Sequence, residues 1–140
     1  MDANGIAAWL AALTSAATLV VTTYVGGRRD HHRWVRDALT DAFVAFLSAS
    51  WKHSDLAKEA ASDGRAAEDM AAQYREMRNQ LTRLRLLATN EVLRAGEELL
   101  RLQRVVQESA AGPEREQALA AASAGRRSVV SAAKREMGLL

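Results

Sequence analysis

An uncharged segment at the N-terminus constrains this chain more than any other feature. No Asp, Glu, Lys, Arg or His occurs between Ala3 and Gly27, and about 20 apolar residues are enough to cross the hydrocarbon core of a bilayer. The segment is only moderately apolar, because Thr and Ser interrupt its Leu, Ile and Val residues. We therefore predict a transmembrane helix at residues 1–27 whose insertion is marginally favourable on its own.

The charges on either side of this segment predict its orientation. Asp2 precedes it, whereas a cluster of arginines follows it. These juxtamembrane arginines are Arg28, Arg29, Arg33 and Arg36. Positive charges concentrate on the cytoplasmic side of membrane proteins, so the N-terminus is predicted outside and the C-terminal domain in the cytoplasm of a single-pass cell-membrane protein. The same arginines are expected to contact anionic lipid headgroups.

Other interpretations of the segment remain open. A cleaved signal peptide needs a basic start, and this one is acidic, although Val25 and Gly27 are compatible with a cleavage site. A helix buried in a soluble protein is a second alternative. A helix lying in the membrane interface would need a charged face, which the segment lacks.

Small residues line one face of the predicted membrane helix. They are Ala7, Ala11, Thr14, Ser15, Thr18, Thr22 and Gly26. Small residues four apart let helix backbones approach closely in lipid, and hydroxyl groups can form hydrogen bonds across the contact. The pattern predicts self-association and hence a homo-oligomer. A narrow pore and a chance pattern are the alternatives.

Periodic apolar residues predict that residues 28–140 form a cytoplasmic helical bundle. The expected helices cover about residues 30–62, 65–87, 90–109 and 113–137. Gly26-Gly27 is a possible hinge, Asp63-Gly64 a stop signal and Gly112-Pro113 a turn. Thr89 or Asn90 can cap a new helix, although one unbroken helix through this region is also possible. The predicted fold is therefore all-α, a transmembrane helix followed by a three- or four-helix antiparallel bundle.

Composition supports helices and narrows the chemistry. Aromatic residues make up 5% of the 140 residues and proline occurs once, which disfavours a β-sandwich or barrel. The absence of cysteine excludes disulfides, thiolate nucleophiles and Cys-ligated zinc. The net charge is +2, and the arginines of the later helices alternate with glutamates. That mixture is typical of a solvated helical surface, so nucleic-acid binding is not expected.

No motif for catalysis or cofactor binding is present. His31 and His32 are adjacent on a helix, and His53 lies far along the same predicted helix, so a shared metal site is not expected. We interpret the three histidines as polar residues near the membrane interface. Glu68-Asp69 and Glu97-Glu98 are neighbours that point in different directions on a helix, as solvated residues do. We expect neither an enzyme nor a cofactor.

Several segments together resemble a known type of sequence. The Ala/Thr/Val segment is followed by a run rich in Arg and His with Trp34, then by Asp41 to Leu47, by Leu84 to Ala88 with Glu91-Val92, and by Lys134-Arg135-Glu136. The chain thereby resembles uncharacterised actinobacterial small single-pass membrane proteins with a helical cytoplasmic domain. The resemblance implies an anchored helical bundle and no known activity.

These features predict a membrane-anchored helical interaction or scaffold protein, with the bilayer, a second copy and an unidentified protein as partners. Candidate contact residues are Trp34, Phe43, Phe46 and Trp51, and the alternative is that they are core or membrane-interface residues. A second hypothesis is a membrane-perturbing oligomeric effector, holin-like or defence-type, that uses the threonine stripe. A third is a soluble helical adaptor with a buried first helix.

Overall fold

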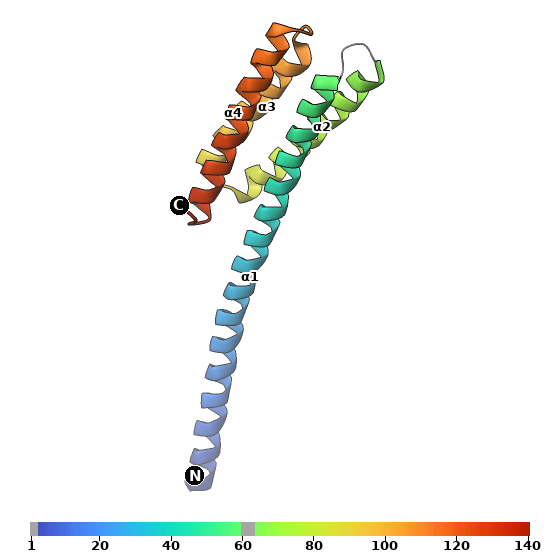
Figure 1. The fold of residues 1–140 in the computed structure, drawn as a ribbon. Coiled ribbons are helices and arrows are strands. Elements are labelled where there is room, and N and C mark those ends of the chain that lie inside the picture. The colour runs from blue at the N-terminus through green and yellow to red at the C-terminus, as the bar shows by residue number, and fades with distance from the viewer. Residues whose placement is uncertain (1–2, 60–63) are drawn as a thin grey trace. The chain divides into compact units, whose positions relative to one another are not determined.

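The described residues are almost entirely helical. The computed structural model describes residues 3–59 and 64–140, with side chains from Gly26 onward. The helices are α1 (Ala3–Glu59), α2 (Gly64–Leu87), α3 (Asn90–Glu108) and α4 (Pro113–Glu136) (Figure 1). The chain divides into two compact units, one up to Asp37 and one from Ala38 to Leu140. The all-α prediction is confirmed.

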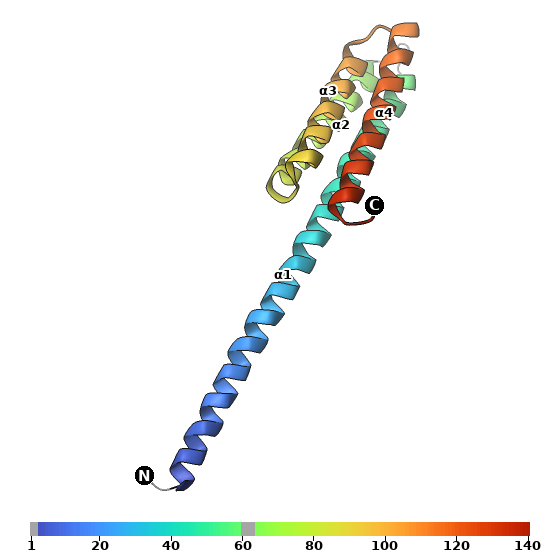
Figure 2. The same cartoon turned by 90° about the vertical axis from the view of Figure 1, so that its left-hand side faces the viewer.

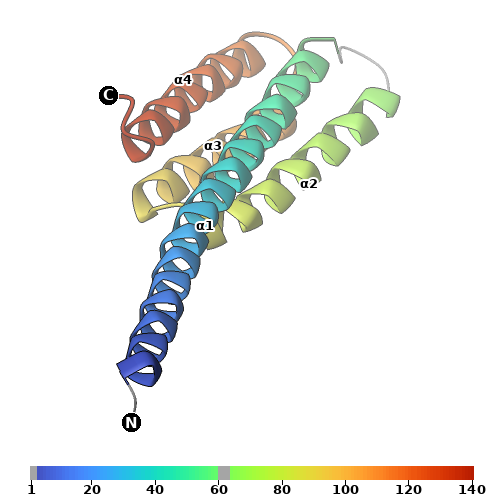
Figure 3. The same ribbon diagram turned by 90° about the horizontal axis from the view of Figure 1, so that it is seen from below.

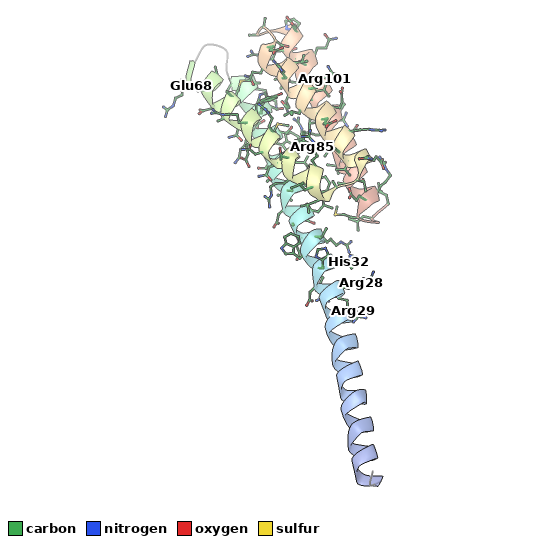
Figure 4. All side chains as sticks on the ribbon, turned by 180° about the vertical axis from the view of Figure 1, so that it is seen from behind. Arg28, Arg29, His32, Glu68, Arg85 and Arg101 are labelled. Atoms are coloured by element: carbon green, nitrogen blue, oxygen red, sulfur yellow. The ribbon has the colours of Figure 1, made fainter. Side chains whose placement is uncertain are left out.

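The first unit is formed by the part of α1 up to Asp37. The helix continues through Gly26 and Gly27, so a hinge at that pair is absent. Arg28, Arg29, Arg33 and Arg36 are exposed, and Figure 4 shows Arg28, Arg29 and His32 along this part of the helix.

The predicted membrane helix falls almost entirely outside the residues whose side chains are described. This applies to the anchor at residues 1–27 and to the small-residue stripe, apart from Gly26. Within the described part of the chain, no helix has both the length and the apolar character needed to cross a membrane. The anchor and the stripe therefore stay predictions.

The second unit contains four helices packed as antiparallel pairs, α1 with α2 and α3 with α4 (Figures 1 and 2). α3 packs against both α2 and α4 (Figure 3). Their buried faces follow the spacing of three and four residues that the sequence shows. The larger core cluster contains Leu39, Ala42, Phe43, Phe46, Ala49, Met77, Leu81, Leu84, Val92, Leu99, Val129, Ala132 and Ala133. Small Ala residues between large ones let these helices approach closely.

The helix is interrupted at Ala88 and Thr89, so α2 and α3 are separate helices and not one unbroken helix. Thr89 occupies the N-cap position of α3, but its side chain does not cap the helix. Its backbone N–H donates to Glu136 Oε1 at 3.0 Å and its hydroxyl donates to Glu136 Oε2 at 3.2 Å. A carboxylate near a helix N-terminus is favourable, so the end of α4 stabilises the start of α3.

The predicted turn at Gly112-Pro113 joins α3 to α4. Gly112 has a φ of +116°, a conformation that favours glycine, and Pro113 begins α4. Arg115 Nη2 donates to the backbone oxygen of Ser109 at 2.7 Å, and Nη1 donates to that of Ala57 at 3.4 Å. This arginine thus joins the turn to the C-terminal end of α1.

Candidate functional site

A cluster of polar side chains lies inside the second unit, where α1, α3 and α4 meet. We call it the polar hub. It comprises Ser50, His53 and Ser54 of α1, Gln103 of α3 and Arg126 of α4. Four of these side chains are fully buried, and Arg126 is 5% exposed. Buried polar groups destabilise a fold unless they are hydrogen-bonded, so their partners decide what the hub does.

Gln103 is the centre of the hub. Its Nε2 group donates to Ser50 Oγ at 2.7 Å, to the Ser50 backbone oxygen at 3.1 Å and to Ser54 Oγ at 3.1 Å. Its Oε1 atom lies 2.7 Å from His53 Nδ1. One amide therefore satisfies three side chains of α1 and fixes α3 against that helix.

Both ring nitrogens of His53 face glutamine side-chain oxygens. Nδ1 lies 2.7 Å from Gln103 Oε1, and Nε2 lies 3.4 Å from Gln107 Oε1. A ring nitrogen that carries a proton donates to the oxygen that it faces. Burial lowers the pKa of His53 from its ordinary value, its hydrogen bonds to Gln107 and Gln103 oppose this, and the charge of Arg126 lowers it further.

Arg126 brings a positive charge to the edge of the hub. Its Nη1 group donates to Ser54 Oγ at 2.8 Å and to Ser50 Oγ at 3.2 Å, while its buried Nε has no hydrogen-bond partner among the described residues. Burial lowers the pKa of Arg126, the charge of Asp55 opposes this and that of Arg127 adds to it. The guanidinium nevertheless stays protonated at neutral pH.

The outer side of Arg126 faces a shallow groove between α1 and α4, which we call the α1–α4 groove. Its volume is about 500 Å³ and its lining is mostly apolar. The lining residues are Leu47, Trp51, Ser123, Arg126, Arg127, Val130 and Ser131. The Trp51 ring lies 4.1 Å from the guanidinium carbon of Arg126 and is 51% exposed. This cation–π contact places an aromatic surface at the groove wall.

The sequence-predicted contact residues separate into two pairs. Trp34 in the first unit and Trp51 in the second are 62% and 51% exposed. Phe43 and Phe46 are core residues, 4% and 0% exposed, which is the alternative that the sequence left open. Their rings belong to a core cluster that also contains residues of α2, α3 and α4.

The interpretation of the histidines changes for one of them. His31 and His32 are exposed in the first unit. The rings of His31 and Trp34 are stacked, with centroids 6.2 Å apart. His53 is not an interfacial residue but a fully buried member of the hub. Among the residues that the structure describes, no group of three or more His, Asp and Glu side chains is placed to hold a metal ion.

A second depression, of about 460 Å³, lies between α2 and α3 and is rich in arginine. Arg75, Arg78 and Arg85 line it together with Asn79, Thr82, Leu81 and Leu100. Arg85 is labelled in Figure 4 and pairs with Glu97 at 3.1 Å, both side chains being half-exposed. This is the solvated Arg/Glu surface that the sequence predicts.

Sequence reasoning did not identify Gln103 or Arg126, although a signal was present. Gln103 falls at a core position of α3, four residues after Leu99 and three before Val106. Arg126 falls between Ala122 and Val129 on the buried face of α4. A polar residue at an apolar position of a helical repeat commonly means a buried polar contact.

Comparison with known proteins completes the description of the site. The chain matches no protein-family model, no curated protein and no solved structure.

Proposed function

We propose that this chain is a membrane-anchored, non-enzymatic interaction protein whose helical bundle is a scaffold for docking another protein. The observation that carries the proposal is the α1–α4 groove, where a half-exposed tryptophan lies among apolar side chains. Exposed apolar surface of this kind is costly in water and is typical of interaction sites. Tryptophan and arginine are also the side chains that most often dominate binding at interfaces.

The hub supports this function by keeping the groove rigid. Arg126 is fixed from the inside by two serine hydroxyls, and Trp51 rests against its guanidinium. Binding to a preorganised surface avoids the entropy cost of ordering side chains. His53, the side chain best suited to acid–base chemistry, is fully buried and engaged with Gln103, so it serves packing rather than catalysis.

The N-terminal segment supplies the membrane and oligomer parts of the proposal. Its uncharged length favours spanning, and the arginines that follow it favour a cytoplasmic bundle. Its stripe of small residues favours contact between copies in the membrane. The groove would then be presented at the inner membrane surface in more than one copy.

Carbonate extraction of cell membranes tests the anchor. The full-length chain should stay in the pellet, and the double substitution Leu19→Arg with Val20→Arg should release it, because each central arginine costs about 2.5–3.5 kcal/mol on insertion scales. The matched control Asp30→Arg places an arginine beyond the uncharged segment and should leave the chain in the pellet. Recovery of the unsubstituted chain in the soluble fraction would refute the anchor.

Photocrosslinking in cells tests docking at the groove. A photoreactive amino acid at Val130 should give a discrete protein adduct that is absent when the same group replaces Ala120, an exposed residue of the same helix. Equal adducts at the two positions, or none at Val130, would contradict a docking function for the groove.

A further inference from the structure

We infer that the α1–α4 groove binds an acidic amphipathic helix of a partner protein, with apolar side chains against Trp51 and Val130 and a carboxylate on Arg126 or Arg127. The inference rests on the proposed docking function and adds the chemistry of the partner. It follows from the shape of the apolar surface and from an imbalance of charge.

The apolar surface has the dimensions of a short helix contact. Val44, Leu47 and Trp51 follow one another at intervals of three and four residues along α1, and Val44 is 62% exposed. At 1.5 Å per residue this line is about 10 Å long, or two helical turns. Val130 of α4 forms the opposite wall. An amphipathic helix presents side chains at the same intervals, so its apolar face matches this surface.

The charges of the groove are unbalanced. Both ionic side chains in its lining, Arg126 and Arg127, are positive. Among residues 26–59 and 64–140, neither arginine forms an ion pair with a carboxylate. Arg127 donates to the neutral hydroxyl of Ser123 at 3.2 Å.

Arg126 makes the imbalance costly. It is 5% exposed, its hydrogen-bond acceptors are uncharged, and its buried Nε has no partner in the described chain. Asp55 acts on this charge from a distance but forms no ion pair with it in the described chain, and a buried charge destabilises a protein when it is not paired. A carboxylate entering the groove would not reach the buried Nε, but it would compensate the charge of Arg126 while forming charge-assisted hydrogen bonds with the exposed Arg127, which are about twice as strong as neutral ones.

The same imbalance disfavours a second copy of the groove as the occupant. A two-fold symmetric contact places each surface against itself. The two copies would then bring two Arg126 and two Arg127 side chains together in a partly desolvated interface without an acidic residue from either lining. Like charges facing each other oppose association, so a complementary acidic partner is favoured.

Binding of designed peptides to the full-length chain in nonionic detergent tests the inference. The probe is a panel of helical peptides of about 20 residues, with Leu at every third and fourth position and Glu elsewhere. The matched panel has Lys in place of Glu. Fluorescence anisotropy should show the best Glu peptide binding about tenfold or more tightly than its Lys counterpart, with the difference reduced by salt.

Substitutions connect this binding to the groove. Arg127→Glu should abolish or reverse the preference for Glu peptides, since Arg127 is exposed and its replacement leaves the hub intact. Trp51→Ala should weaken both panels alike by removing apolar surface. Arg94→Glu makes the same charge change at an exposed residue of α3 outside the groove and should leave binding unchanged.

Three results would overturn the inference. The first is a Glu panel that binds no better than the Lys panel, or a preference that Arg127→Glu leaves unchanged. The second is that the unsubstituted chain shows no preference between the peptide panels, while Arg127→Glu abolishes its binding to phosphatidylglycerol vesicles. This result would show that the groove binds lipid. The third is a dimer that dissociates when Arg127 is replaced by Glu, which would show that the groove binds a second copy of the chain. If crosslinking from Val130 in cells persists in any of these cases, the proposed docking function is kept and only the acidic nature of the partner is rejected.

Discussion

His53 Nδ1 lies 2.7 Å from Gln103 Oε1, and both side chains are completely buried between α1 and α3. Around this contact the hydroxyl groups of Ser50 and Ser54 and the guanidinium of Arg126 complete a polar cluster inside an otherwise Ala- and Leu-rich bundle. Several consequences of this arrangement can be measured.

Gln103→Leu should destabilise the bundle strongly. The substitution keeps similar volume but removes the group that serves His53, Ser50 and Ser54. Each buried polar group left without a partner costs about 1–3 kcal/mol. Ser50 and Ser54 keep their hydrogen bonds to Arg126, so a total loss of about 2–5 kcal/mol is expected. Urea unfolding followed by circular dichroism measures it. The control Gln117→Leu changes an exposed glutamine of α4 and should shift stability by less than about 0.5 kcal/mol. Equal effects would show that the hub is not stabilising.

Stability should fall as the pH drops below about 6.5, the ordinary pKa of histidine. Burial lowers the pKa of His53 in the folded chain, and Arg126 of α4 adds to this, while Tyr74 of α2 lies nearby with ring centroids 6.3 Å apart. The unfolded chain therefore binds a proton that the folded chain excludes, and stability is lost from pH 6.5 down toward the lowered pKa. The slope for one proton cannot exceed about 1.4 kcal/mol per pH unit.

Comparison of unfolding curves at pH 7.5 and pH 5.5 measures this dependence. His53→Gln removes the titrating group and should flatten it, whatever its effect on stability at pH 7.5. His31→Gln is the matched control, because His31 is exposed, and should retain the dependence. If the His53→Gln variant keeps the same pH dependence of stability, then other titrating groups cause that dependence.

Phe46→Ala should cost about 3–5 kcal/mol, the range for removing a fully buried ring. Trp34→Ala removes a larger ring that is 62% exposed and should change the unfolding of the bundle by less than about 0.5 kcal/mol. Thermal unfolding of the two variants distinguishes core from surface aromatics. A large effect of Trp34→Ala would mean that this ring is covered in solution.

Gly96→Val should be destabilising by about 1–3 kcal/mol through overpacking. A Cβ atom at Gly96 would lie 2.8 Å from Leu81 Cδ1 and 3.8 Å from Phe46 Cζ, so the added branches have no room. The control Ala120→Val introduces the same side chain on the exposed face of α4 and should cost only its lower helix propensity, within about 0.7 kcal/mol. Equal denaturation midpoints would contradict the close α2–α3 packing.

Replacing Thr14, Thr18 and Thr22 together by Leu should weaken self-association while retaining membrane insertion. Leu is larger, so it separates helix backbones and removes hydroxyl hydrogen bonds, but it favours insertion. Crosslinking in membranes should show loss of the oligomer. The same replacement of Ala8, Ala12 and Ala16, another set at intervals of four, is the control. Loss in both variants would mean that the stripe is not the specific contact.

Helix positions were largely predictable from the sequence, because turns and apolar spacing are local signals. Gly64 is the first residue of α2, and Gly112-Pro113 lie at the start of α4. Met77, Leu81 and Leu84 are buried as their spacing predicts. The cap of α3 was less predictable, because Glu136 comes from another helix.

Local signals could mark Gln103 and Arg126 as buried polar residues, but they could not predict the partners of these side chains or the groove. Trp51 continues the apolar face of α1 in the sequence, yet it is half-exposed, because Ser50, His53 and Ser54 take the inward positions. That choice is made by Gln103 and Arg126, which lie far along the chain and contact α1 only in the folded state. Tertiary hydrogen bonding thus overrides the ranking of residues by hydrophobicity.

The hub also selects one alignment of the helices. A core of alanine and leucine is nearly repetitive, and a shift of α1 along α3 by one turn, about 5.4 Å, would keep apolar groups against apolar groups. The same shift would separate Gln103 from His53 and Ser50 and break the hydrogen bonds that join them. Polar residues at such positions are known to specify register. In this bundle the hydrogen bonds of Gln103 to α1 therefore belong to the native alignment of the two helices.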